Sequence, residues 1–336
     1  MSSKPSIPAH PSGETMKAVC FTSFGKPDDV LSVQVIPKPF VSDADEVLIK
    51  VHAASLNPID KWRVGGYLTE MFPEQHETSV LGYDVSGVIE QVGEEASKSF
   101  KVGDEVFVRL DGMKYGASAE YVVCSVPEIA KKPSNISFSE AASVPLVGLT
   151  ALQSLRKGGV TEGSKVFIPA GAGGVGSLGI QIAKKMLKAS HVCTTASPGA
   201  GFDICKKAGA DRIIDYRSEN FEEALAGEDF DMAFDLMTEA GRMGALLKKG
   251  GKIISITGNP NEDGAAENAA KQAGGTWEFL IMHPDGKDLA EIATYIESGE
   301  ITTFVDMEAP SIDDFKAAVD RLWSGRSKGK CVIKIA

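Results

Sequence analysis

The feature that most constrains this chain is a glycine-rich run near its middle. The run reads Gly171-Ala172-Gly173-Gly174-Val175-Gly176. It follows an apolar segment, residues 166–170, and leads into a segment with apolar residues at helical spacing. Glycine lets a backbone approach a phosphate closely, and the start of a helix presents free N–H groups to it. The run therefore predicts a dinucleotide-binding loop, with a tight turn in a nucleotide-free sheet as the alternative.

Strand and helix patterns alternate after residue 139, which predicts an α/β domain with a doubly wound parallel sheet covered on both faces. The expected strands are residues 166–170, 191–195, 212–215, 232–236, 252–257 and 277–282. The polar stretch 259–275 is expected to be a surface excursion. Six expected strands make a full doubly wound sheet.

A different pattern precedes this sheet. Short apolar or alternating runs from residue 16 to about 137 are separated by Gly, Pro and Asp turns, which predicts a β-rich domain. Helices at 287–298 and 312–324 and a last strand at 331–335 are expected to return to that domain. Residues 1–15 are rich in Ser and Pro and are expected to form a disordered tail.

The charge and hydropathy of the chain exclude several functions. Its 336 residues carry a net charge of -11, which repels nucleic-acid phosphates and anionic membranes. No run of 18 apolar residues is present, and residues 1–15 lack the features of a secretory or transit peptide. We therefore expect a soluble, cytoplasmic protein that acts on a small neutral molecule.

The end of the second expected strand indicates which nucleotide is preferred. NAD-selective sites usually place a carboxylate there to hold the ribose 2′-hydroxyl, but this stretch reads Thr194-Thr195-Ala196-Ser197. Without that acid, Thr195 and Ser197 suit a 2′-phosphate, and Arg217, beside Tyr216 after the third strand, is a candidate cation. NADPH is therefore favoured. The alternatives are that NAD binding is only weakened and that Arg217 is a solvated surface residue.

At this point the sequence resembles the medium-chain dehydrogenase/reductase superfamily, in its zinc-independent quinone oxidoreductase group, and most of all the plant-type alkenal/one (enone) oxidoreductases. The segments that carry the resemblance are residues 54–60, 81–89, 116–121, 171–178, 209–216 and 295–299. It implies a GroES-like catalytic domain of residues 16–139 and 286–336, a Rossmann domain of residues 140–285, NADPH as cofactor, and a homodimer.

The resemblance also implies further contacts with the cofactor. Thr150, the loop at Thr257 and Gly258, and Lys330 match positions near the nucleotide in this family. Thr150 can instead be a capping or packing hydroxyl, and Lys330 a solvated edge lysine. One departure is that no lysine follows Ser197 where family members commonly carry one, which bears on the strength of the NADPH preference.

Zinc ligands that the zinc-dependent relatives carry are replaced here. Asn57 stands where those relatives have a cysteine, and Tyr83-Asp84 stands where they have His-Glu. The five cysteines lie far apart and are expected to be reduced, mostly buried thiols, and the five histidines are scattered and form no motif. A catalytic zinc needs about three converging ligands, so we expect no metal.

Without a metal, hydride transfer to an already activated acceptor is the easier reaction. Hydrogen-bond donors near the substrate oxygen stabilise the charge that develops there, and Asn57 and Tyr67 are the candidates, with Tyr83 lining the pocket. Asn57 can instead cap a turn, Tyr67 can pack on the glycines at 65 and 66, and Tyr83 can belong to the core.

The predicted function is an NADPH-dependent reductase of enones and alkenals, with NADPH:quinone reduction on the same fold as the first alternative. The second alternative is a non-catalytic NADPH-binding protein.

Overall fold

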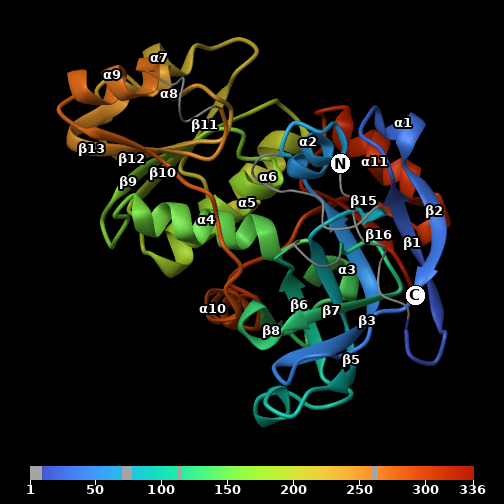
Figure 1. Ribbon diagram of the computed structural model, residues 1–336. Helices are drawn as coiled ribbons and strands as arrows, with labels where there is room; N and C mark the ends of the chain where they lie inside the picture. Colours follow the sequence, from blue (N-terminus) through green and yellow to red (C-terminus); the bar gives the residue numbers. More distant parts are fainter. Residues whose placement is uncertain (1–9, 70–77, 112–115, 259–263) are drawn as a thin grey trace. The chain divides into compact units, whose positions relative to one another are not determined.

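The computed structural model describes residues 10–69, 78–111, 116–258 and 264–336 (Figure 1). The chain divides into two compact units. The first unit contains the residues up to Leu146 together with Pro284–Glu297 and Val305–Ala336, and the second contains Val147–His283 and Ser298–Phe304. Residues 1–9 of the expected tail lie outside the described residues, and the first strand begins at Thr15.

The first unit is rich in β-strands, as its alternating apolar residues predict. Its strands are β1 (Thr15–Phe21), β2 (Ser32–Pro37), β3 (Glu46–Leu56), β4 (Ser79–Val80), β5 (Asp84–Val92), β6 (Glu105–Arg109), β7 (Tyr121–Ser125), β8 (Ile129–Lys131), β15 (Val305–Ala309) and β16 (Lys330–Lys334). Its helices are α1 (Pro27–Val30), α2 (Pro58–Val64), α3 (Phe138–Ala142), α10 (Gly286–Glu297) and α11 (Phe315–Trp323).

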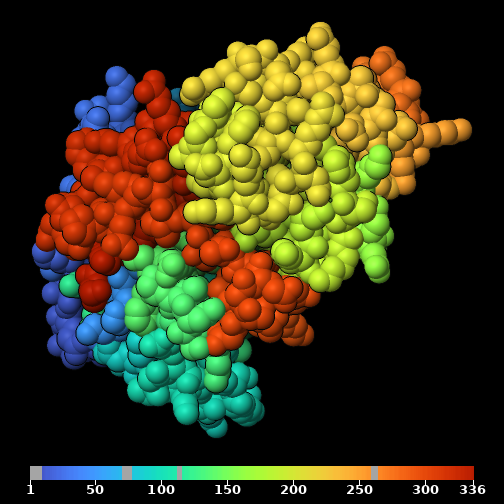
Figure 2. All heavy atoms as spheres, turned by 180° about the vertical axis from the view of Figure 1, so that it is seen from behind, coloured from blue at the N-terminus to red at the C-terminus, as the bar shows by residue number. Residues whose placement is uncertain are grey.

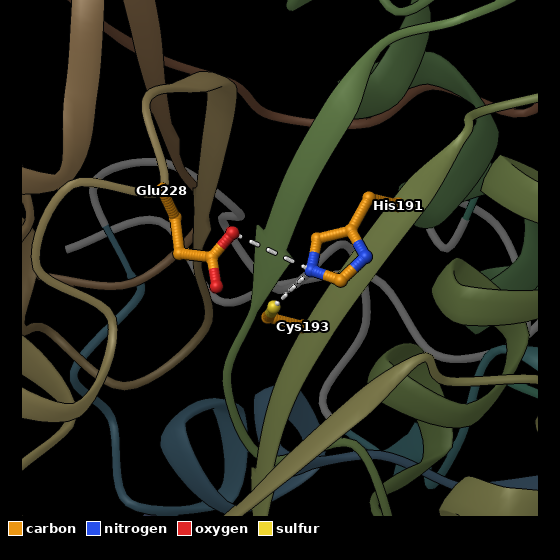
Figure 3. A group of neighbouring side chains, drawn as sticks. All are labelled: His191, Cys193 and Glu228. Carbon is orange, nitrogen blue, oxygen red and sulfur yellow. Dashed lines mark hydrogen bonds and ion pairs between the residues drawn. The ribbon is translucent and has the colours of Figure 1, made fainter.

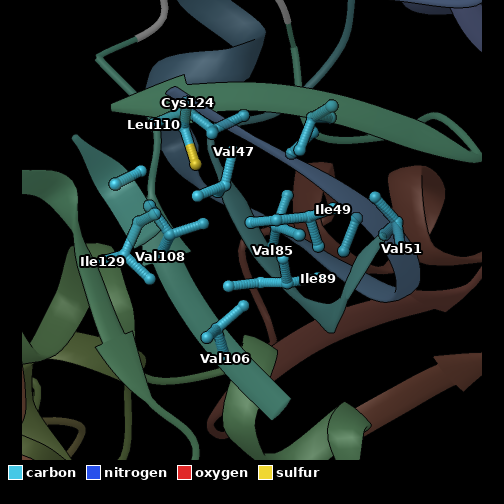
Figure 4. Close-up of a cluster of buried hydrophobic side chains, with 14 residues drawn as sticks. Val47, Ile49, Val51, Val85, Ile89, Val106, Val108, Leu110, Cys124 and Ile129 are labelled. Carbon is cyan, nitrogen blue, oxygen red and sulfur yellow. The ribbon is translucent and has the colours of Figure 1, made fainter. Parts of the chain in front are cut away.

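These strands form two sheets. One has the order β2-β1-β4, and the other has the order β15-β16-β3-β5-β6-β8, with β7 also paired to β3. An apolar cluster of the unit lies inside the larger sheet, where side chains of β3, β5, β6 and β7 point toward one another (Figure 4). Val47, Ile49, Val85 and Val106 in this cluster are at most 1% exposed.

The end of the chain completes the first unit. Strand β16 pairs antiparallel with β3, with Cys331 opposite Leu56. Helix α11 packs against β15 and β16, and Ala318 and Val319 join an apolar cluster with Val19 of β1. In Figure 2 the C-terminal segment, in red, accordingly lies beside N-terminal segments in blue. This pairing carries Lys330, the first residue of β16, to the end of β3.

The second unit is built on one six-stranded parallel sheet. Its strands are β9 (Lys165–Ile168), β10 (His191–Ala196), β11 (Arg212–Asp215), β12 (Phe230–Asp235), β13 (Leu247–Ser255) and β14 (Thr276–Phe279). Its helices are α5 (Gly174–Gln181), α6 (Ala200–Ala208), α7 (Phe221–Ala224), α8 (Ala240–Met243) and α9 (Gly264–Gln272), and α4 (Pro145–Lys157) enters it from the first unit. The order β11-β10-β9-β12-β13-β14 confirms the predicted doubly wound sheet.

Two segments of the second unit differ from the sequence expectation. Part of the expected surface excursion at 259–275 forms helix α9, because Ala266 and Ala270 pack on the apolar cluster beneath it. Residues 259–263 lie outside the described residues. Gln181, expected on the polar face of its helix, is buried and exchanges two hydrogen bonds with the backbone of Thr302, at 2.7 and 2.9 Å.

Among the described residues, no helix is long and apolar enough to cross a membrane.

Candidate functional site

The glycine run forms the loop between β9 and α5 in the second unit. Helix α5 begins at Gly174, with Gly173 as its N-cap. The N–H group of Gly171 donates to the Thr195 carbonyl at 2.9 Å, and the N–H of Ala170 donates to Thr195 Oγ1 at 3.0 Å. The loop is therefore fixed to the end of β10, while the N–H groups of the first turn of α5 have no partner within the helix.

The loop has no space for side chains where the strand and the helix approach each other. A Cβ on Gly176 would lie 2.3 Å from the Ala170 carbonyl oxygen, and one on Gly171 would lie 2.1 Å from Thr194 Oγ1. Gly173 is different, because a Cβ there would meet only the Ala170 carbonyl oxygen, at 3.2 Å. Close packing at the first and last glycines and an open side at Gly173 fit the binding of a pyrophosphate at the start of α5.

The other residues predicted to contact the nucleotide in this unit follow the carboxyl ends of neighbouring strands. Ala196 of β10 pairs with Asp215 of β11, so Ser197 and Tyr216, the next residues, lie at the same edge of the sheet. A Cβ on Gly201 would lie 3.2 Å from Ser197 Oγ, which places that hydroxyl beside the first turn of α6. The sheet therefore brings these residues to the edge that holds the glycine loop.

Arg217 and Tyr216 are both exposed at this edge. The guanidinium of Arg217 lies 6.0 Å from the centre of the Tyr216 ring, and its backbone N–H donates to Asp215 Oδ1 at 3.1 Å. The second carboxylate oxygen of Asp215 accepts from Ser218 Oγ. The guanidinium of Arg217 is thus accessible from solvent. Its contact with the 2′-phosphate of a nucleotide stays a prediction.

Thr257 and Gly258 follow β13 at the same edge. Thr257 Oγ1 accepts a hydrogen bond from the Thr238 N–H at 3.0 Å, and Gly258 adopts a φ of 94°, which favours glycine. Thr150 lies in α4 and is 3% exposed. Thr195 is 6% exposed, and its hydroxyl accepts from the backbone of the glycine loop, so it supports the loop.

The first unit contains a buried polar cluster around Asn57, the residue at the N-cap of α2. Asn57 Nδ2 donates to Asp84 Oδ2 at 2.8 Å, and Asn57 Oδ1 accepts from Lys330 Nζ at 2.6 Å. Lys330 Nζ also donates to the Leu56 carbonyl at 2.6 Å and lies 3.6 Å from Asp84 Oδ2. Asn57 is fully buried and both ends of its amide are held, so it positions this cluster.

Asp84 holds the cluster together from β5. In addition to Asn57, Ser55 Oγ donates to Asp84 Oδ2 at 3.1 Å, and the Leu146 N–H donates to Oδ1 at 2.8 Å. Burial raises the pKa of Asp84 and lowers the pKa of Lys330, while the attraction between the two charges opposes both shifts. The interactions of the carboxylate with Asn57, Ser55, Leu146 and Lys330 favour the charged form of both groups, and therefore the ion pair.

A second buried carboxyl, Asp60, lies in the first turn of α2. Its Oδ2 accepts from the Asn57 N–H at 2.7 Å, which caps the helix. Burial raises the pKa of Asp60 to about 7, although the bond from Asn57 and the charges of Lys330 and Arg63 act in the opposite direction. Asp60 is therefore close to half protonated at neutral pH.

The two tyrosines predicted for the catalytic site lie in different environments. Tyr83 is 1% exposed, and the guanidinium groups of Arg109 and Arg63 lie 5.1 and 5.6 Å from its ring centre. Tyr67 is 82% exposed, and its ring packs on Gly65, where a Cβ would come within 2.6 Å of Tyr67 Cε2. The structure thus places Tyr83 in the core of the first unit and Tyr67 on its surface.

Sequence reasoning missed Asp84 and Asp60 as members of the polar cluster, and it predicted Lys330 only as a cofactor contact. Lys330 is 5% exposed, so it is not a solvated edge lysine. One signal for Asp84 was present. It is an acid at the start of strand β5, it is followed by five apolar or small residues, and such a carboxylate needs a partner when it is buried.

Comparisons with known proteins give a consistent result. A family model described as "Alcohol dehydrogenase GroES-like domain" matches residues 43–134, and one described as "Zinc-binding dehydrogenase" matches residues 208–333. The chain is 36% identical to the 2-methylene-furan-3-one reductase of Solanum lycopersicum over 326 residues, which is 95% of this chain and 79% of that protein. It is 35% identical, with the same coverage, to the chloroplastic NADPH-dependent alkenal/one oxidoreductase of Arabidopsis thaliana. A solved quinone oxidoreductase from Coxiella burnetii is 32% identical, with a TM-score of 0.84 over 96% of this chain and 100% of that one.

Proposed function

Because this chain belongs to the medium-chain dehydrogenase/reductase superfamily, in its quinone oxidoreductase-like group, we propose that it is an NADPH-dependent reductase of activated carbon–carbon double bonds. At the level shared with its relatives, it is an NAD(P)H-dependent oxidoreductase. The proposed substrates are α,β-unsaturated ketones and aldehydes. Homodimer formation belongs to the same proposal, since it is implied by the family resemblance.

The observation that carries the cofactor proposal is the edge of the parallel sheet in the second unit. The glycine loop lies at the switch in strand order between β9 and β12, which is where dinucleotides bind in such sheets. Backbone N–H groups of the first turn of α5 would hold the pyrophosphate. Ser197 and Arg217 would hold the 2′-phosphate, since no acid occupies the end of β10.

The chemistry supplied by NADPH when bound is hydride transfer. In the first unit the Lys330 ammonium and the Asp84 carboxylate fix the direction of the Asn57 amide. Among the described residues, Asp84 accepts one of the two N–H bonds of Asn57 Nδ2, and the other N–H would donate to the substrate oxygen. The exposed Tyr67 hydroxyl would be a second donor. These donors stabilise the negative charge that develops on that oxygen. In the proposed reaction the β-carbon of the substrate receives the hydride, and water supplies the proton for the adjacent α-carbon.

The donor set of the cluster around Asn57 also supports a reaction without a catalytic metal. The cluster contains an amide, carboxyl groups and the Lys330 ammonium, which offers no lone pair to a metal ion. The ammonium therefore supplies the positive charge that the buried Asp84 carboxylate requires. An activated acceptor needs less polarisation than a simple ketone, so this set of groups suits enones.

One assay tests the proposed function. The purified protein should oxidise NADPH in the presence of vinyl ketones or 2-alkenals, and product analysis should show a saturated carbonyl rather than an alcohol. Turnover of quinones alone would favour the alternative of a quinone reductase, which the likeness to the Coxiella burnetii structure supports. Tight NADPH binding without turnover of either class would exclude both enzymes and favour a binding protein.

The preference for NADPH has its own test. Ser197→Asp places a carboxylate at the end of β10, and it should weaken NADPH binding and leave or improve NADH binding. Arg217→Ala should raise the KM for NADPH without changing that for NADH. Lys249→Ala is the matched control, because it removes an exposed positive charge of the same unit at the other end of the sheet. Equal effects of Arg217→Ala and Lys249→Ala would show that Arg217 is a solvated surface residue.

A further inference from the structure

A group of three potential metal ligands lies in the second unit, at the amino-terminal edge of the parallel sheet. His191 and Cys193 are the first and third residues of β10, and Glu228 belongs to the loop that precedes β12. The glycine loop follows the carboxyl end of β9, which is parallel to β10. The three ligands are therefore at the opposite edge of the sheet from the proposed nucleotide site.

The side chains of these residues point toward one another (Figure 3). His191 Nε2 lies 3.1 Å from Cys193 Sγ and 3.7 Å from Glu228 Oε2, and one atom from each residue lies within 4.8 Å of the others. Tetrahedral zinc, at roughly 2.0 to 2.3 Å from its ligands, requires ligand atoms roughly 3.4 to 3.6 Å apart. Displacements of a few tenths of an ångström would bring the two measured pairs to that spacing.

Local structure explains why the three side chains meet. Residues two apart on a strand point to the same face of the sheet, so His191 and Cys193 project together. Glu228 is presented by the chain just before β12, where the neighbouring residue Asp229 adopts a left-handed φ of 56°. The amino-terminal ends of parallel strands lie at one edge, which brings the loop before β12 to this edge.

Further groups hold the potential ligands in the required orientation. Arg212 Nη1 donates to Glu228 Oε1 at 3.0 Å, which leaves Oε2 directed at the imidazole. The second ring nitrogen of His191, Nδ1, lies 3.9 Å from Asp211 Oδ2, and Asp211 is itself held by the Val192 N–H and Lys184. A carboxylate on the far nitrogen of a metal-binding histidine is a recurring feature of zinc sites, since it orients the ring.

We propose that His191, Cys193 and Glu228 bind one zinc ion, with water in the fourth position. Among the common divalent ions, zinc is the one that a thiolate, an imidazole and a carboxylate together typically bind. The two negatively charged ligands balance its charge. Cys193 is buried and its neighbours are partly exposed, so an ion reaches the site from the side of His191 and Glu228. Binding replaces the thiol proton, which is released to solvent.

This zinc would be distinct from a catalytic metal. It would join β10 to the loop before β12 at the edge of the sheet remote from the glycine loop, and so would stabilise the nucleotide-binding unit rather than act on a substrate. The proposal is therefore independent of the proposed reductase function, and each can fail without the other.

Cobalt binding tests the site directly. The full-length protein, dialysed against a chelator and then into metal-free buffer, should bind one equivalent of Co²⁺ with a thiolate-to-cobalt charge-transfer band, and Zn²⁺ should displace it. Cys193→Ser should remove that band, and His191→Gln should weaken Zn²⁺ binding by at least about 10-fold. Asp211→Asn should also weaken it, because Asp211, 3.9 Å from Nδ1, would orient the ring of the zinc-bound histidine.

Controls separate loss of the site from loss of the fold. His283→Gln is matched to His191→Gln, because His283 is exposed in the same unit and belongs to no group of three ligands among the described residues. It should keep full affinity. Far-UV circular dichroism and thermal melting without metal verify the fold of each variant, with Cys193→Ala as a second thiol variant. Absence of the cobalt band in the wild type, or its persistence in both Cys193 variants, would overturn the proposal.

Discussion

The buried pair of Lys330 and Asp84 allows a quantitative test of the cluster around Asn57. Lys330→Met keeps most of the side-chain volume but removes the ammonium that contacts the Leu56 carbonyl and Asn57 Oδ1, both at 2.6 Å, and Asp84 Oδ2 at 3.6 Å. Removing one partner of a buried pair typically costs about 3 to 5 kcal/mol, because the other charge remains without compensation. We expect a loss of that size in the free energy of unfolding of the first unit.

A double-mutant cycle isolates the interaction between the two charges. Lys330→Met combined with Asp84→Asn removes both charges, and replacement of a whole buried pair is often nearly neutral. The double variant should therefore be destabilised by clearly less than the sum of the single variants, with an interaction free energy of about 2 kcal/mol or more. Lys334→Met is the surface control, because Lys334 lies on the same strand and forms an exposed pair with Glu308 worth at most about 1 kcal/mol.

Urea unfolding in a Trp277→Phe background provides the measurement. Trp62 and Trp323 then report on the first unit alone, since Trp277 is the tryptophan of the second unit. If Lys330→Met cost no more than Lys334→Met, or if the two single effects were additive, the assignment of Lys330 to this cluster would be refuted. A raised dissociation constant for NADPH with unchanged stability would instead support Lys330 as a contact of the cofactor.

Two further predictions concern acidity and packing. Burial raises the pKa of Asp60 from 3.8 to about 7, so between these values the native state keeps a proton that the unfolded state releases. The contribution of this proton to stability is therefore fully present below pH 4 and is lost as the pH rises through 7. Asp60→Asn should remove this loss, which amounts to at most roughly 4 kcal/mol, and equal pH profiles of unfolding for variant and wild type would contradict it. Gly176→Ala should abolish measurable NADPH binding in fluorescence titrations, because its Cβ would lie 2.3 Å from the Ala170 carbonyl oxygen. Gly179→Ala in the same helix should bind normally, because its Cβ would lie 3.6 Å from the nearest side chain.

The parallel sheet could be predicted from the sequence because its signals are local. Most strands of the second unit contain a short apolar run, and the alternation with helices predicts that the strands are parallel. Parallel strands place all their carboxyl ends at one edge, so residues that follow two such strands, such as Ser197 and Tyr216, are expected at the edge of the glycine loop without knowledge of the register. Helix α9 was not predicted because its buried residues are alanines, which give only a weak apolar pattern in the sequence. The helix is stabilised mainly by packing on the apolar cluster beneath it.

The cluster around Asn57 could not be predicted from local patterns. Asn57 lies 27 residues from Asp84 and 273 from Lys330 along the chain, and only the pairing of β16 and β5 with β3 brings the three together. The same applies to the proposed zinc site, where the alternation of His191 and Cys193 is visible in the sequence but the position of Glu228 depends on the order of the strands. A scattered set of histidines therefore does not by itself exclude a metal site.

The burial of Asn57 changes what its side chain contributes to the proposed reaction. An amide held on one side by an ammonium and on the other by a carboxylate cannot rotate without leaving two buried charges unsatisfied, which costs several kcal/mol. Its orientation is therefore set before any substrate binds, and a donor that needs no reorganisation stabilises a developing charge most effectively. Since the ammonium lies on the Oδ1 side, the amide presents only N–H to a further partner, and that partner must be an acceptor. The carbonyl oxygen of an enone meets this requirement as both substrate and product, because reduction of the carbon–carbon double bond leaves the carbonyl intact. The hydroxyl formed by reduction of a quinone or a simple ketone has to donate its own proton elsewhere.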